Sequence, residues 1–134
     1  MKTVFFCMIL ATAIAGAQTN EQIFNMRSKC GELGEKLLNE YFPIDGNIII
    51  SSSQVTAYNS TTNRCYVEIR YTQRIEKSLC FTRDLFDAQT RKELAAVTEY
   101  LATPKINFGV IGGMFTEIHQ AEKYIDAMME QNDN

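Results

Sequence analysis

Hydrophobic positions along this chain follow two spacings, one typical of helices and the other of strands. Residues 20–41 carry apolar side chains three and four positions apart, which predicts an amphipathic helix that begins at a Thr or Asn cap and ends at Phe42-Pro43. Residues 119–131 repeat this spacing and predict a second helix. Within the first helix, Gly31 and Gly34 lower helix stability, so we expect another part of the backbone to pack closely there.

Between the two helical patterns, short runs of β-branched and aromatic residues predict strands over 47–58, 65–72 and 78–83. In the second run, Cys65, Val67, Ile69 and Tyr71 alternate with polar neighbours, which predicts one buried face and one polar face. Residues 106–111 and 114–118 flank Gly112-Gly113, a dipeptide that favours a tight hairpin turn.

Residues 88–102 fit two structures. Their Ala and Glu content favours a helix capped by Asp87 and ended by Pro104, and a strand is the close competitor. We therefore expect an α+β fold with an N-terminal helix, an antiparallel β-meander of about four to five strands, and a C-terminal helix packed on the same sheet.

The first residues resemble a signal peptide. Lys2 precedes an apolar run from Val4 to Ala15, and small residues lead to Ala17 before polar Gln18. The apolar run of about 12 residues is shorter than the roughly 20 that cross a bilayer. We therefore expect residues 1–17 to be removed between Ala17 and Gln18, and residues 18–134 to form a single small globular domain that is periplasmic or secreted.

Charge and composition restrict the partners. The 13 basic residues include Lys2, so the chain after cleavage has 12 against 16 acidic residues, a net charge of −4. An acidic chain with scattered basic residues argues against nucleic acid as a partner, and against a membrane surface once the signal is removed. With a single His and no C-x-x-C motif, we expect no metal and no cofactor.

Three cysteines remain after cleavage, and an odd number outside the cytosol predicts one disulfide and one free thiol. Cys30 lies on the apolar stripe of the first helix and Cys65 begins the buried face of a strand, so we favour a Cys30–Cys65 bond. A Cys65–Cys80 bond is the first alternative, and a chain in which all three thiols are free is the second. We expect Cys80 to be a buried thiol.

The segment Ala57–Glu68 (AYNSTTNRCYVE) resembles the hallmark of a set of small exported bacterial proteins of uncharacterised function. Those chains have a cysteine in the first helix, a Tyr-Asn pair, an Asn-Arg-Cys-Tyr strand start and a stretch like Leu85-Phe86-Asp87-Ala88. Ala57 stands where they usually carry a His. The resemblance implies the fold and export, and it implies no activity.

Candidate chemistry is sparse. Tyr58, Asn59, Asn63 and Arg64 form a polar cluster that could hold a small polar ligand, although Asn residues commonly serve the turn that contains them. A Cys80–His119 dyad would need an exposed thiol, and we expect His119 instead to cap the last helix. Acidic residues three positions apart, such as Asp84 and Asp87, are common on protein surfaces.

These observations favour a non-catalytic binding or interaction protein of the cell envelope, whose partner is an unknown protein or a small polar ligand. The alternatives are a secreted effector or inhibitor of another protein, and a small enzyme that uses Cys80 or His119. An enzyme should show one of these side chains exposed in a pocket, whereas an interaction protein should show an apolar patch or an open sheet edge.

Overall fold

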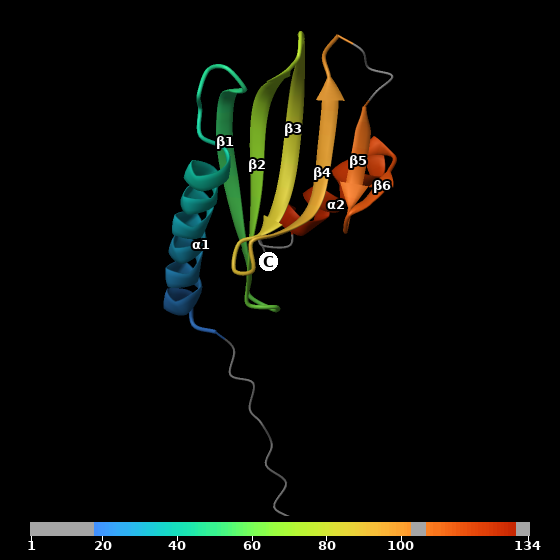
Figure 1. The fold of residues 1–134 in the computed structure, drawn as a ribbon. Coiled ribbons are helices and arrows are strands. Elements are labelled where there is room, and N and C mark those ends of the chain that lie inside the picture. Colours follow the sequence, from blue (N-terminus) through green and yellow to red (C-terminus); the bar gives the residue numbers. More distant parts are fainter. Residues whose placement is uncertain (1–17, 103–106, 131–134) are drawn as a thin grey trace, which may run out of the picture.

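The computed structural model describes residues 18–102 and 107–130. Its six strands form one antiparallel sheet in which every strand pairs with its neighbour in sequence, so the predicted α+β meander is confirmed (Figure 1). Residues 1–17, with the expected signal peptide, and 131–134 lie outside the described residues. The elements are α1 (Asn20–Tyr41), β1 (Ile49–Asn59), β2 (Arg64–Ile75), β3 (Ser78–Asp87), β4 (Lys92–Tyr100), β5 (Phe108–Ile111), β6 (Met114–Thr116) and α2 (Ile118–Glu130).

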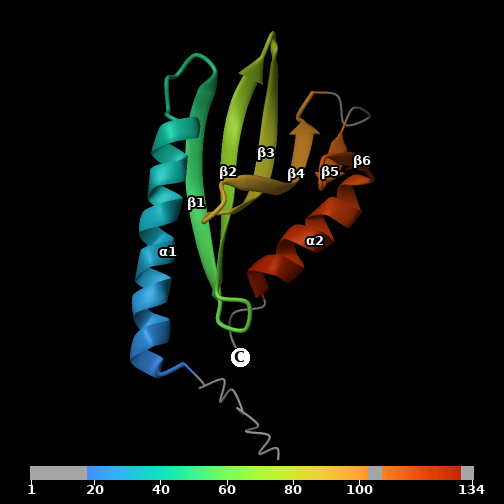
Figure 2. The same cartoon turned by 60° about the horizontal axis from the view of Figure 1, so that its bottom comes forward.

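The two helices pack on the same sheet, as expected, but on opposite faces. One core cluster joins α1 to the odd-numbered residues of β2, among them Val67 and Ile69. The other joins α2 to Tyr66 of β2 and to Leu85, Ala95 and Val97. Because successive strand residues point to opposite faces, the clusters lie on either side of the sheet (Figure 1, Figure 2). We call these sides the α1 face and the α2 face.

The helix favoured over residues 88–102 is wrong, because Lys92–Tyr100 forms β4. This segment lies between β3 and β5 and pairs with both, so ladder hydrogen bonds and burial of Ala95 and Val97 under α2 override its helical propensity. Asp87 is not a helix cap; its carboxylate accepts the backbone N–H groups of Gln89 and Thr90 in the β3–β4 turn. The extra strand brings the sheet to six, above the expected four to five.

Local signals position the other elements. Thr19 caps α1 through a capping box with Gln22, as the polar start of the helix predicted. Gly112 and Gly113 adopt φ values of 58° and 82° in the predicted β5–β6 hairpin. At Gly34, an added Cβ would collide with the side-chain oxygen of Gln54, so α1 approaches β1 closely there.

Candidate functional site

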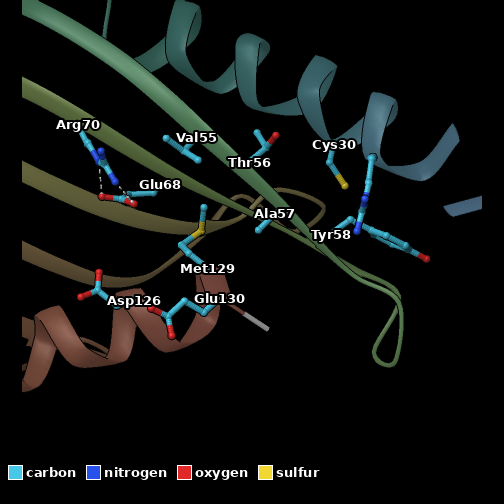
Figure 3. A pocket seen from close by; sticks show the side chains of 11 residues that line it. Cys30, Val55, Thr56, Ala57, Tyr58, Glu68, Arg70, Asp126, Met129 and Glu130 are labelled. Carbon is cyan, nitrogen blue, oxygen red and sulfur yellow. Dashed lines mark hydrogen bonds and ion pairs between the residues drawn. The ribbon is translucent and has the colours of Figure 1, made fainter. Parts of the chain in front are cut away.

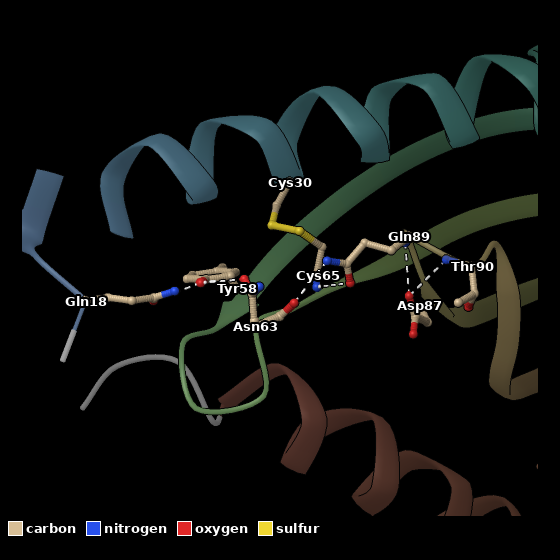
Figure 4. The surroundings of a disulfide bond; sticks show 8 residues. All are labelled: Gln18, Cys30, Tyr58, Asn63, Cys65, Asp87, Gln89 and Thr90. Carbon is tan, nitrogen blue, oxygen red and sulfur yellow. Dashed lines mark hydrogen bonds between the residues drawn. A yellow bond between two sulfur atoms is a disulfide. The ribbon is translucent and has the colours of Figure 1, made fainter. Parts of the chain in front are cut away.

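The predicted polar cluster lies around the β1–β2 turn, where its side chains hold the turn together. The Tyr58 hydroxyl hydrogen-bonds to the side-chain amides of Gln18 and Asn63, each at 2.9 Å (Figure 4). Asn63 adopts a positive φ of 54°, and the Asn59 side chain accepts the Thr62 backbone N–H at 2.9 Å. These groups stabilise the turn and show no converging arrangement around a ligand.

Arg64 points toward the neighbouring β3–β4 turn. Its guanidinium lies 3.0 Å from the Asp87 carboxylate, which also holds two backbone N–H groups of that turn. The Gln89 side chain joins the same region, accepting the Cys65 N–H at 3.2 Å and donating to the Asn63 carbonyl at 3.0 Å. Arg64 therefore cross-links two turns at one end of the sheet.

Cys30 and Cys65 form the favoured disulfide, with Cα atoms 5.4 Å apart, and Cys80 is free and fully buried (Figure 4). The bond joins the middle of α1 to the start of β2. Disulfides of this kind are typical of proteins that function in oxidising compartments.

Cys80 and His119 do not form a dyad. Cys80 pairs with Gln73 in the β2–β3 ladder and therefore shares the α1 face with Tyr71, whereas His119 lies on α2, across the sheet. Burial raises the pKa of the Cys80 thiol, which disfavours the reactive thiolate. His119 is the second residue of α2 rather than the expected cap; its ring is exposed and lies 3.3 Å from the Glu117 carboxylate.

A groove of about 460 Å³ lies at the outer edge of β1 (Figure 3). Four consecutive β1 residues, 55–58, line it, and consecutive strand residues face opposite ways, so the groove spans the edge of the strand. α1 forms one wall and α2 the other, while β2 contributes two charged residues. The lining consists of Arg27, Cys30, Val55, Thr56, Ala57, Tyr58, Glu68, Arg70, Asp126, Met129 and Glu130.

β1 is an open edge strand. It stands at the end of the strand order, so within residues 18–102 and 107–130 no strand pairs with its outer edge. Its sequence, IISSSQVTAYN, is 11 residues long. Proteins usually protect an edge strand with charged residues or proline, and β1 contains neither. The opposite edge strand, β6, has only 3 residues. β1 thus presents the longer and less protected edge.

A network of ion pairs fixes the floor of the groove. The Glu68 carboxylate, only 1% exposed as a residue, receives two bonds from Arg70 at 2.7 and 3.0 Å and one from Arg83 at 2.6 Å. Arg83 also bonds to Asp126 of α2 at 2.7 Å. Burial raises the pKa of Glu68, but the bonds from Arg70 and Arg83 outweigh burial and leave this pKa below its ordinary value.

The α2 wall carries negative charge. Asp126 and Glu130 lie one turn apart on this wall, and the last turn of α2 contains no basic residue. A helix C-terminus is itself the negative end of the helix dipole, so two carboxylates add to an unfavourable field there. At the end of α1, by contrast, Glu40 pairs with Arg91 at 3.1 Å.

Sequence reasoning missed the groove and its charged residues. The alternation in β2 placed Glu68 and Arg70 on a polar face, but it did not show that α2 packs over that face and buries Glu68. The available signal was Glu68 itself, a carboxylate flanked by apolar residues in a strand and followed two positions later by Arg70.

Comparisons with family models, with curated proteins and with solved structures found no match to the chain. Within residues 18–102 and 107–130, no three His, Cys, Asp or Glu side chains gather as a metal site requires. No helix in those ranges has the length and apolar character to cross a membrane.

Proposed function

We propose that this chain is an exported, non-catalytic binding domain of the cell envelope, which receives an extended segment of a partner protein along the open edge of β1. Export rests on residues 1–17, with cleavage between Ala17 and Gln18, and on the resemblance to small exported bacterial proteins. The Cys30–Cys65 bond agrees with such a compartment.

The observation that carries the proposal is the groove at β1. An edge strand of 11 residues without charge or proline can accept another strand wherever its outer backbone groups are not already bonded, as those of Ile49 are to Asp45 and Gly46. α1 and α2 flank that edge and leave space for side chains of an added segment. Neither Cys80, which is buried, nor His119 lines the groove, which argues against the small enzyme.

A selection from a display library of random peptides tests the proposal, with two edge variants for comparison. Val55→Lys introduces a charge into the groove at a half-exposed position, and Met114→Lys makes the same change on the opposite edge, β6. Peptides enriched on the unmodified protein should bind Met114→Lys and lose affinity for Val55→Lys. Amide exchange should show protection of residues 53–58 when such a peptide is bound.

Two results would refute this function. The first is enrichment of no peptide above the level found with Val55→Lys. The second is enrichment of peptides that bind Val55→Lys normally and that protect β6 or another surface. The export part has a separate test, since the intact mass of the protein recovered from culture should correspond to a chain that begins at Gln18.

A further inference from the structure

We infer that the segment bound at β1 presents a basic side chain, Lys or Arg, to the α2 wall of the groove. The inference rests on the proposed function and specifies the chemistry of the partner. It is carried by the combination of an unpaired strand edge with an acidic helix end beside it. Neither feature alone would define what the groove accepts.

The charge of the α2 wall is only partly neutralised within the domain. Asp126 uses one carboxylate oxygen to bind Arg83, and its side chain remains 52% exposed. Glu130 is exposed at the end of the helix. Of the two arginines that line the groove, Arg70 is already bound to buried Glu68 through two hydrogen bonds, and Arg27 belongs to the α1 wall. A cation supplied from outside would therefore complement both carboxylates and the negative end of the helix dipole.

The geometry of strand addition places a side chain there. A strand paired with β1 continues the pleat of the sheet, so alternate side chains of the added segment lie on the α2 face. On that face they meet Val55 and Ala57 of β1 and Met129 of α2, with Asp126 and Glu130 beyond. The apolar stem of Lys or Arg can cover the first three residues while its charged end reaches the carboxylates (Figure 3).

The groove also limits the length of this segment. Four β1 residues line it, and a strand rises about 3.3 Å per residue, so roughly four to six residues of the partner fit between the helices. Two or three of them face α2. One basic residue among them complements the acidic wall, and small or β-branched neighbours favour the strand conformation.

Binding of defined peptides tests the inference. The probes are short synthetic peptides of alternating Val and Thr, labelled with fluorescein, whose central residue is Lys, norleucine or Glu. Fluorescence anisotropy should show the Lys peptide binding about five- to tenfold more tightly than the norleucine peptide, and the Glu peptide most weakly. At about 1 M salt the Lys preference should largely disappear, because exposed charges are then screened.

A charge reversal on the wall provides the matched comparison. Glu130→Lys should remove the preference for the Lys peptide or reverse it. Glu76→Lys makes the same change of net charge at the exposed β2–β3 turn, away from the groove, and should leave the preference intact. Circular dichroism of both variants should match that of the unmodified protein.

Different failures have different meanings. If the norleucine and Lys peptides bind equally and Glu130→Lys changes neither affinity, the inference is wrong while the peptide-binding function stands. If no peptide binds and β1 stays unprotected, both are wrong. If the protein instead dimerises with concentration and protects residues 53–58 without any peptide, the occupant is a second copy of the chain and the inference is overturned.

Discussion

Asp84 should make the stability of the domain fall as the pH rises from about 4 to about 7. Its side chain lies on the α1 face of β3, 5% exposed, and accepts one hydrogen bond from the Tyr71 hydroxyl at 2.9 Å. Burial raises the pKa of Asp84 from 3.8 to about 7, and the nearby charge of Glu93 contributes to this increase. The folded protein therefore holds a proton that the unfolded chain has already released.

The sign and size of the effect follow from this difference in pKa. Below about pH 4 the carboxyl group is protonated in both states, so the stability associated with the proton is fully present. Between about pH 4 and 7 only the folded state keeps it, and stability is lost progressively as the pH approaches 7. A difference of about three pKa units corresponds to about 4 kcal/mol in the free energy of unfolding.

Asp84→Asn removes this titration and keeps the shape of the side chain. We expect the free energy of unfolding of the variant to decrease much less between pH 4 and 7. At pH 8 the variant should be more stable than the unmodified protein by several kcal/mol. Urea titrations followed by far-ultraviolet circular dichroism, at unit steps of pH, measure both quantities. The pKa of Glu93 is also raised by burial, so the variant Glu93→Gln serves as a control that measures how much of the pH dependence comes from Glu93. An unchanged slope in Asp84→Asn, or a loss of stability at pH 8, would refute the reasoning.

Three further predictions concern packing and thiols. Replacing both Cys30 and Cys65 with Ser should lower the free energy of unfolding by about 3–4 kcal/mol in urea titrations, since the bond closes a loop of 35 residues. Gly34→Ala should lower the melting temperature because its Cβ would meet Gln54 and Thr56, whereas Gly31→Ala, which meets nothing within 4 Å, should raise stability by up to about 1 kcal/mol. Cys80 should react with a maleimide slowly in the folded protein and rapidly in denaturant, as mass spectrometry would show.

The spacing of hydrophobic residues correctly predicted those elements whose conformation in the fold agrees with their local sequence pattern. The stripe of α1 and the Gly112-Gly113 hairpin are both local signals, and the structure confirms them. Residues 92–100 form a strand despite their helical propensity, because their conformation is decided by β3 and β5, which lie on either side. Helical propensity is worth tenths of a kcal/mol per residue, and pairing on both edges outweighs it.

The site was less predictable for a related reason. Alternation in β2 shows which residues share a face, but it does not show whether a helix covers that face. Glu68 was therefore assigned only to a polar face, and the spacing of Asp84 and Asp87 was interpreted as that of surface residues, yet all three carboxylates are buried. The groove depends on where the last helix ends relative to the first strand, and no local pattern encodes that distance.

The position of the disulfide has a consequence for the binding that we propose at β1. Cys30 lies in the part of α1 that lines the groove, and its bond to Cys65 fastens this wall to the sheet. A wall held in place before a segment arrives loses little conformational freedom when the segment binds, so more of the contact energy appears as affinity. The same bond links affinity to oxidation state. In reducing surroundings only non-covalent contacts would hold the wall, and the segment would bind less tightly.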